Sequence, residues 1–255
     1  MRYWLIAIWR TMPRSWIIVS LPIVTPFVLL FLWWVFAGLF LTSPDPRHLV
    51  HKAELERLLP QARAGDRSAQ IRVGTIYREG LSGKAEPAEA VRWFSEAAKK
   101  GDADAQLAMG ELYARGQGVR QDFARAAEFY RSATLNRNIH AQFLLGDLYF
   151  HGRGVPHDYG QAIEWFRKAA LAGHAGAQSV MGSIYEKGFG VDRDLAAAFV
   201  WYSLAADNRA AAMKARGDID PREAAASIKA SLSRLELRNA ERQLAETRRR
   251  LRSAG

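Results

Sequence analysis

Apolar and small residues return along residues 69–210 of this chain with a constant spacing of 36 positions. Within a unit, apolar residues three and four positions apart, such as Leu144, Leu145 and Leu148, form the stripe of an amphipathic helix. A glycine-containing turn at 152–154 ends that stripe, and Asp158 then occupies the position of a helix N-cap. The pattern therefore predicts two helices per unit and four units without insertion or deletion.

The residues that recur in every unit are small or aromatic. They are, in the first unit, Ala69-Gln70, Gly74, Tyr77, Gly80, Ala90, Trp93-Phe94 and Ala97, with equivalents at each step of 36. Small residues suit positions where two helices approach closely, and aromatic rings fill the remaining space. One helix pair cannot bury its own stripe, so such units are expected to stack into a solenoid.

These residues resemble the Sel-one-like repeat, a branch of the tetratricopeptide superfamily. The resemblance covers residues 69–210 and implies an all-α fold, namely a right-handed alpha-alpha solenoid of about four 36-residue helix-turn-helix repeats. It also implies protein–protein interaction instead of catalysis. The turn Leu81-Ser82-Gly83 departs from the Gly-x-Gly-Val of the later units, and Arg137 and Arg209 replace the closing glycines Gly101 and Gly173. These departures do not change the expected fold, but the sequence does not assign the conformation of these turns.

The flanks extend the solenoid. Residues 54–68 are predicted to be a half-repeat, which Pro60 kinks or ends. Residues 211–255 are expected to form capping helices with a basic tail. Asp220-Pro221-Arg222-Glu223 is a helix start, and one helix is predicted from there to about Arg252. That helix either covers the last repeat or binds a partner of its own.

Residues 16–41 contain no charged residue and exceed the roughly 20 residues that cross a bilayer. We therefore predict one transmembrane helix at 16–41, preceded by a basic and aromatic segment at 1–15 and followed by a linker at 42–53. The expected membrane residues are Trp16, Pro22, Pro26, Trp33 and Trp34. A cleaved secretory signal is the alternative, but its apolar core would be shorter, at about 7–15 residues.

The orientation of this segment rests on few charges. Three basic residues lie on each side of it, and the nearest, Arg10 and Arg14 against Arg47, favour a cytoplasmic N-terminus. The expected location is a bacterial inner membrane with the repeats in the periplasm. Repeats in the cytoplasm are the alternative. The absence of cysteine excludes disulfides and cysteine metal or redox sites.

The net charge of +10 is concentrated at the two ends, with +3 in residues 1–42 and +5 in residues 211–255. The densest run is Arg248, Arg249, Arg250 and Arg252. This run is interpreted either as a solvated helix end or as a contact for anionic lipid headgroups. A nucleic-acid partner is not expected, because no aromatic residue lies among the arginines.

No catalytic constellation, cofactor site or metal site is predicted. His48 and His51 are three positions apart, but they have no third ligand at a usual spacing. The glycine-rich turns recur once per unit and follow helices, so they are explained as structural turns and not as phosphate loops.

The superfamily resemblance places a binding groove on the first helix of each repeat. The groove candidates carried over on that basis are Arg78, Glu111, Arg115, Phe143, Asp147, Phe150, His151 and Lys187. Phe143 and Phe150 are seven positions apart on one face. They are either exposed apolar anchors for a partner or rings packed against the neighbouring repeat.

Two functions remain open from the sequence. The first is a membrane-anchored adaptor that recruits or regulates an envelope partner through the solenoid groove. The second is a structural or accessory subunit of a multiprotein membrane complex, which the apolar residues of segment 1–15 favour. The sequence names neither the partner nor the oligomeric state.

Overall fold

The computed structural model describes Trp33 and residues 46–254. Apart from Trp33, which is 67% exposed, the predicted membrane segment and its named residues lie outside the described part of the chain. Among the residues that the structure does describe, no helix combines the length and the apolarity needed to cross a bilayer. The chain divides into two compact units, residues 1–50 and 51–255.

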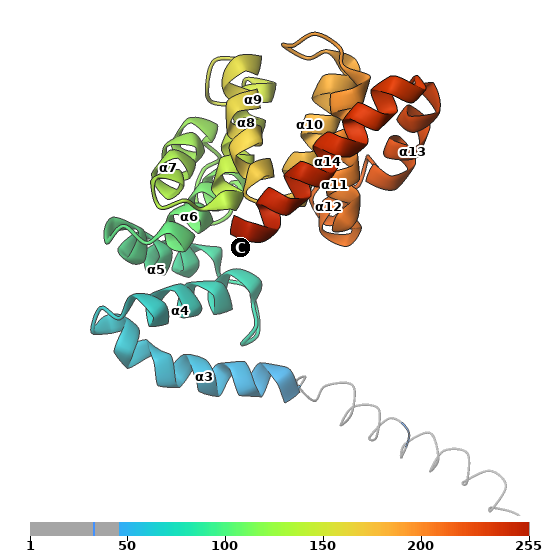
Figure 1. The fold of residues 1–255 in the computed structure, drawn as a ribbon. Coiled ribbons are helices and arrows are strands. Elements are labelled where there is room, and N and C mark those ends of the chain that lie inside the picture. The colour runs from blue at the N-terminus through green and yellow to red at the C-terminus, as the bar shows by residue number, and fades with distance from the viewer. Residues whose placement is uncertain (1–32, 34–45, 255) are drawn as a thin grey trace, which may run out of the picture. The chain divides into compact units, whose positions relative to one another are not determined.

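Residues 46–254 form twelve helices and no strand (Figure 1). The helices are α3 (Pro46–Arg63), α4 (Arg67–Glu79), α5 (Pro87–Lys99), α6 (Ala103–Arg115), α7 (Phe123–Leu135), α8 (Ile139–His151), α9 (Tyr159–Leu171), α10 (Ala175–Lys187), α11 (Leu195–Asp207), α12 (Arg209–Ala215), α13 (Pro221–Ser231) and α14 (Arg234–Ala254). The all-helical solenoid predicted from the sequence is confirmed. Its predicted right-handed twist stays a prediction.

Helix α3 begins at Pro46, so residues 46–53, predicted as linker, are helical. Proline suits the first turn of a helix, because the N–H that it lacks would have no partner there. Pro60 lies inside α3 and does not end it.

Each repeat is a pair of helices of 13 residues, α4–α5, α6–α7, α8–α9 and α10–α11. Asp122, Asp158 and Asp194 accept backbone hydrogen bonds at the starts of α7, α9 and α11, as predicted. Glu86 makes no such side-chain bond, and Pro87 opens α5 instead. The first repeat therefore lacks the side-chain cap of the later repeats, and this difference is confined to the start of α5.

The recurrent glycine of each first helix lies directly against an aromatic ring of the second helix. A Cβ added to Gly146 would lie 2.9 Å from the ring of Phe166, and one added to Gly110 would lie 2.4 Å from Tyr130. Phe166 is only 1% exposed, whereas its neighbour Trp165 is half-buried. The second member of each aromatic pair is thus the core residue.

The recurrent glutamine joins consecutive repeats. The side-chain amide of Gln178 donates to the carbonyl of Ala170, 3.1 Å away at the end of the preceding helix, and Gln70 donates likewise to Ala62. Gly154 lies so close to the start of α7 that an added Cβ would be 2.2 Å from the backbone of Phe123. The repeats are therefore held together through backbone atoms as well as apolar side chains.

The two arginines that replace closing glycines adopt different backbone conformations. Arg137 adopts the left-handed conformation, with φ of 57°, as Gly101 and Gly173 do in their own turns. Arg209 does not, because α11 ends at Asp207 and Arg209 already begins the short helix α12.

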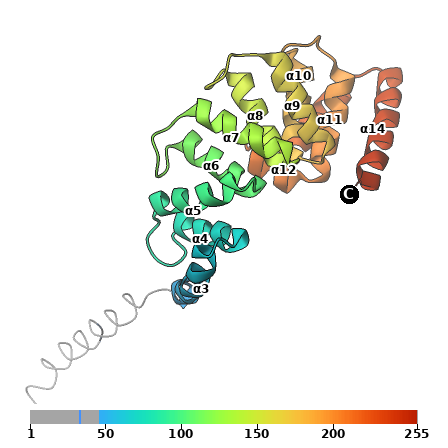
Figure 2. The same ribbon diagram turned by 90° about the vertical axis from the view of Figure 1, so that its left-hand side faces the viewer.

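The C-terminal region contains two helices after α12, whereas the sequence pattern predicts one. α13 ends at Ser231, and Ser233 starts α14 through reciprocal hydrogen bonds with Glu236. This is a capping box, in which each side chain accepts a hydrogen bond from the backbone N–H of the other residue. Both helices pack against α11, and Ala240 and Leu244 of α14 join its core. Figure 2 shows α14 as a separate helix at the C-terminal end of the array.

The basic run of α14 is partly engaged by the solenoid. Arg248 forms two hydrogen bonds of 2.7 Å with the carboxylate of Asp207. Arg249, Arg250 and Arg252 are exposed. The side chain of Arg248 therefore pairs with the last repeat.

Candidate partner-binding groove

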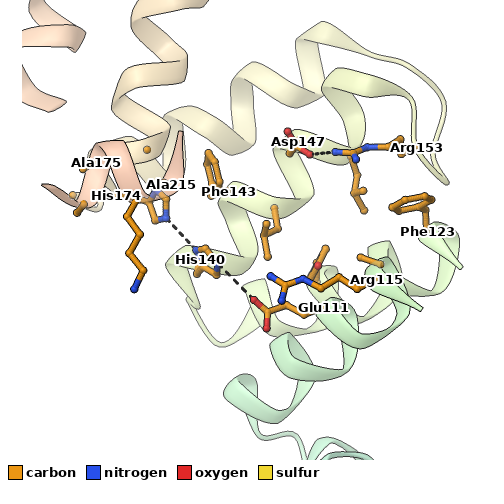
Figure 3. A pocket seen from close by; sticks show the side chains of 18 of the residues that line it. Glu111, Arg115, Phe123, His140, Phe143, Asp147, Arg153, His174, Ala175 and Ala215 are labelled. Carbon is orange, nitrogen blue, oxygen red and sulfur yellow. Dashed lines mark hydrogen bonds and ion pairs between the residues drawn. The ribbon is translucent and has the colours of Figure 1, made fainter. Parts of the chain in front are cut away.

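A groove of about 960 Å³ lies across the first helices of repeats two to four and α12 (Figure 3). α6 and α8 provide two of its walls, and α12 closes the opposite side against the start of α10. Gly176 of α10 permits this last contact, because a Cβ there would lie 2.4 Å from the Cβ of Ala215. The floor includes Phe143 and Leu144.

A line of polar side chains crosses the groove from one repeat to the next. Arg78 of repeat one donates to Glu111 of repeat two at 3.1 Å. The other oxygen of Glu111 lies 3.8 Å from Nε2 of His140 in repeat three. Nδ1 of His140 lies 3.1 Å from Nε2 of His174, which begins repeat four. Four consecutive repeats are thus linked, and Figure 3 shows the part of this line from Glu111 to His174.

The hydrogen bonds of His174 determine where its proton lies. Its Nδ1 accepts the backbone N–H of Ala177 at 3.0 Å, which makes His174 the N-cap of α10. The neutral ring must then carry its proton on Nε2 and donate it to His140. The ring of Phe143 stacks on that of His174, with centroids 4.5 Å apart.

Burial keeps both histidines neutral. Burial, and then the neighbouring His140, lower the pKa of His174 from 6.5 to about 4. Burial also lowers the pKa of His140, against the opposing effect of Glu111. A proton on Nδ1 of His174 would in addition remove the cap and place a cation at the positive end of a helix. The pair therefore adds no charge to the groove at neutral pH.

The carboxylate of Asp147 is engaged within its own repeat. Arg153, from the turn after α8, forms an ion pair with it, and Nε2 of His151 lies 3.3 Å from it. The guanidinium of Arg153 also lies over the ring of Phe123, 5.4 Å from its centroid. The groove carboxylates Glu111 and Asp147 are thus both paired with arginine.

Two cations of the groove have no such partner. Arg115, at the end of α6, and Lys214, on α12, line the groove and are exposed. Neither forms a hydrogen bond or ion pair with any residue in the described part of the chain. They come from opposite sides of the groove, with α8 between them.

The structure brings together four of the eight groove candidates. Glu111, Arg115, Phe143 and Asp147 line the groove, whereas Arg78, Phe150, His151 and Lys187 lie outside the lining. Arg78 and His151 still contact the lining carboxylates. Whether any of them binds a partner stays a prediction.

Of the two interpretations of the phenylalanines, the structure favours packing against the neighbouring repeat. Phe143 is 6% exposed and lies in one core with Phe166, and Phe150 contacts Tyr159 and Phe189 at 5.1 and 5.5 Å between centroids. Phe143 is therefore a buried core residue, and Phe150 is a half-buried ring packed against Phe189 of repeat four.

Sequence reasoning missed His140, His174, Arg153 and Lys214. Histidine is an unusual N-cap, and only its alignment with Asp102 and Asn138 at steps of 36 indicated that role. Lys214 was missed because the groove candidates were taken only from the first helices of the four repeats, and α12 follows them. Within residues 46–254 and at Trp33, no three potential ligands cluster to hold a metal ion.

Comparison with known proteins identifies the repeats. The model of the Sel1 repeat matches residues 67–102, 103–138, 139–174 and 175–209. A protective antigen of uropathogenic Escherichia coli with an SLR fold is 34% identical over 68% of this chain, with a TM-score of 0.59. A Sel1 repeat protein from Oxalobacter formigenes is 29% identical over 60% of this chain, with a TM-score of 0.56.

The chain spans 40% of the length of the first of these proteins and 63% of the second. No curated protein matches the sequence. The four consecutive matches nevertheless cover more than half of the chain and coincide with the four helix pairs of the structure. The chain therefore belongs to the Sel1 repeat family.

Proposed function

We propose that this protein is a membrane-anchored adaptor that recruits or regulates an envelope protein through the groove across repeats two to four. Sel1 repeat proteins mediate protein–protein interactions. The observation that carries the proposal is the groove itself, which presents two exposed, unpaired cations above an apolar floor.

The membrane part of the proposal rests on the uncharged stretch at 16–41. Three basic residues lie on each side of it, and the nearest ones, Arg10 and Arg14 against Arg47, favour a cytoplasmic N-terminus with the repeats in the periplasm of a bacterial cell. The anchor would keep the groove close to the membrane surface and limit its partners to proteins found there.

Site-specific cross-linking in native membranes tests the groove. A photoreactive residue at Ala211, exposed in the groove, should capture one discrete partner. The same residue at Gln161, exposed on α9 and outside the groove lining, serves as the control. Equal capture from both positions, or capture from Gln161 alone, would place the binding surface elsewhere.

A structural subunit of a membrane complex is the second candidate. The apolar residues near the start of the chain favour it, namely Tyr3, Trp4, Leu5, Ile6, Ile8 and Trp9. In that case a photoreactive residue at Trp4 should capture the partner, and one at Ala211 should not. The two positions thus separate an adaptor from a subunit held by its N-terminal segment.

A further inference from the structure

We propose that the groove recognises an acidic segment of its partner, with carboxylates placed at Arg115 and Lys214 and small apolar side chains on the floor formed by Phe143 and Leu144. The proposal rests on the proposed function, since it takes the groove to be the binding site. It adds the chemical class of the ligand.

The charges of the groove carry this inference. The lining contains the carboxylates of Glu111 and Asp147, and Arg78 and Arg153 already pair with them. Arg115 and Lys214 have no partner within the described residues. A basic segment would have to compete with two arginines for the carboxylates, whereas an acidic segment meets two free cations.

The positions of these cations also define how the segment lies. Arg115 comes from α6 and Lys214 from α12, and the groove between them is lined by α8. A chain that contacts both must therefore cross α8, over Phe143 and Leu144. The opposite wall consists of small residues, including Ala211 and Ala215, and allows a backbone to approach closely.

The same surface is poorly suited to nucleic acid. Single strands are held by basic grooves together with exposed aromatic rings on which bases stack. The ring of Phe143 is 6% exposed and already stacked on His174. Glu111 and Asp147 would also lie against a continuous phosphate backbone. A peptide with spaced carboxylates avoids both problems.

Fluorescence anisotropy with the full-length protein in a non-ionic detergent tests the proposal. The probe is a labelled peptide of about 12 residues that alternates glutamate with alanine and leucine, long enough to cross the groove when extended. Two further probes replace every glutamate with glutamine or with lysine. The acidic probe should bind, the other two should bind at least about tenfold more weakly, and added salt should weaken the acidic probe.

A matched pair of variants locates the binding. Arg115→Gln with Lys214→Gln should weaken the acidic probe about tenfold or more. Lys84→Gln with Arg120→Gln removes the same charge from exposed turns outside this groove and should leave binding unchanged. Circular dichroism checks that both variants remain folded, as expected for exposed side chains without partners.

Three outcomes would overturn the proposal. Equal weakening by both variants would show attraction to net charge alone. Tighter binding of a single-stranded oligonucleotide, lost in the Arg115 and Lys214 variant, would assign the groove to nucleic acid. Absence of acidic-probe binding while Ala211 still captures a partner in membranes would retain the groove as the binding site and reject its acidic ligand.

Discussion

At the starts of α8 and α10, the N-cap residue has two contacts, one within its own helix and one with the preceding repeat. Asn138 accepts from Ala141 and donates to Asp104, and His174 accepts from Ala177 and contacts His140. A single side chain therefore couples the start of a helix to the junction between repeats. At the junction of repeats three and four that side chain is titratable.

The junction of repeats three and four should weaken in acid. The pKa of His174 is about 4 in the folded protein, below the 6.5 of an unperturbed histidine. Between these values the unfolded chain binds more protons, so the free energy of unfolding should fall as the pH drops from about 6.5 to about 4. After allowance for solvent screening, the loss is about 1–3 kcal/mol.

Urea unfolding at several pH values measures this loss. His174→Asn keeps a cap of the type found at Asn138. In this variant the free energy of unfolding should change less with pH between about pH 6.5 and about pH 4. At about pH 8 the variant should lose the stacking on Phe143 and the hydrogen bond to His140, each about 0.5–1.5 kcal/mol. An unchanged slope in His174→Asn would assign the acid sensitivity to other groups.

The aromatic pair of each second helix should respond unequally to truncation. Phe166→Ala removes a ring that is 1% exposed and seated on Gly146, and should cost about 3–5 kcal/mol in the free energy of unfolding. Trp165→Ala, at a half-buried ring beside Lys168, should cost about 1–2 kcal/mol. A larger loss for Trp165→Ala in thermal or urea unfolding would contradict this core assignment.

The recurrence of residues allowed the core to be predicted, but not the groove. A glycine recurs at 146 and an aromatic pair at 165–166 at every step of 36, so close packing of the two helices could be predicted, but not that Phe166, and not Trp165, lies on Gly146. Phe143 has no such recurrence, since Ser179 and Leu107 occupy the equivalent positions. Periodicity assigns a residue to a helix face. It does not determine whether solvent or the next repeat covers that face.

At the scale of elements, the ends of the helices carry most of the differences between repeats. Each first helix ends at a glycine in the left-handed conformation, as at Gly152 with φ of 64°. The turns after the second helices α5 and α9 place Gly101 and Gly173 in that conformation, whereas the equivalent turn after α7 places Arg137 in it. The left-handed conformation costs a non-glycine residue about 1–2 kcal/mol, so this turn carries a small penalty that its equivalents avoid.

Arg137→Gly should therefore stabilise the repeats by about 0.5–1 kcal/mol, after the greater freedom of glycine in the unfolded chain is subtracted. Gly173→Ala is the converse change, because φ there is 90° and an added Cβ meets no atom within 4 Å. It should destabilise by about 1 kcal/mol through backbone conformation alone. Unfolding midpoints that move in the same direction for both variants would contradict this explanation.

The break between α13 and α14 is marked in the sequence by Ser233 followed three positions later by Glu236. The stronger start at Asp220 obscures it, because both segments share one sparse apolar stripe that a single helix would explain equally well. Helix boundaries in this region depend on capping side chains more than on hydrophobic spacing.

At the scale of the whole molecule, the proposed topology makes the two ends of the chain distinguishable. A reporter that is active only in the periplasm should be active when fused after Gly255 and inactive when fused before Met1. The expectation follows from the uncharged stretch at 16–41 and the arginines that precede it. The opposite pattern would place the repeats in the cytoplasm.

The packing of α13 and α14 on α11 limits how such an array can lengthen during evolution. Ala240 and Leu244 belong to the same core as Phe199 and Tyr202, so a duplicated unit added after Asp207 would have to displace that core. A duplication of residues 103–138 within the array would instead meet neighbours of its own kind on both sides. Growth from the middle therefore preserves the two different ends, and would increase the distance between them by whole repeats.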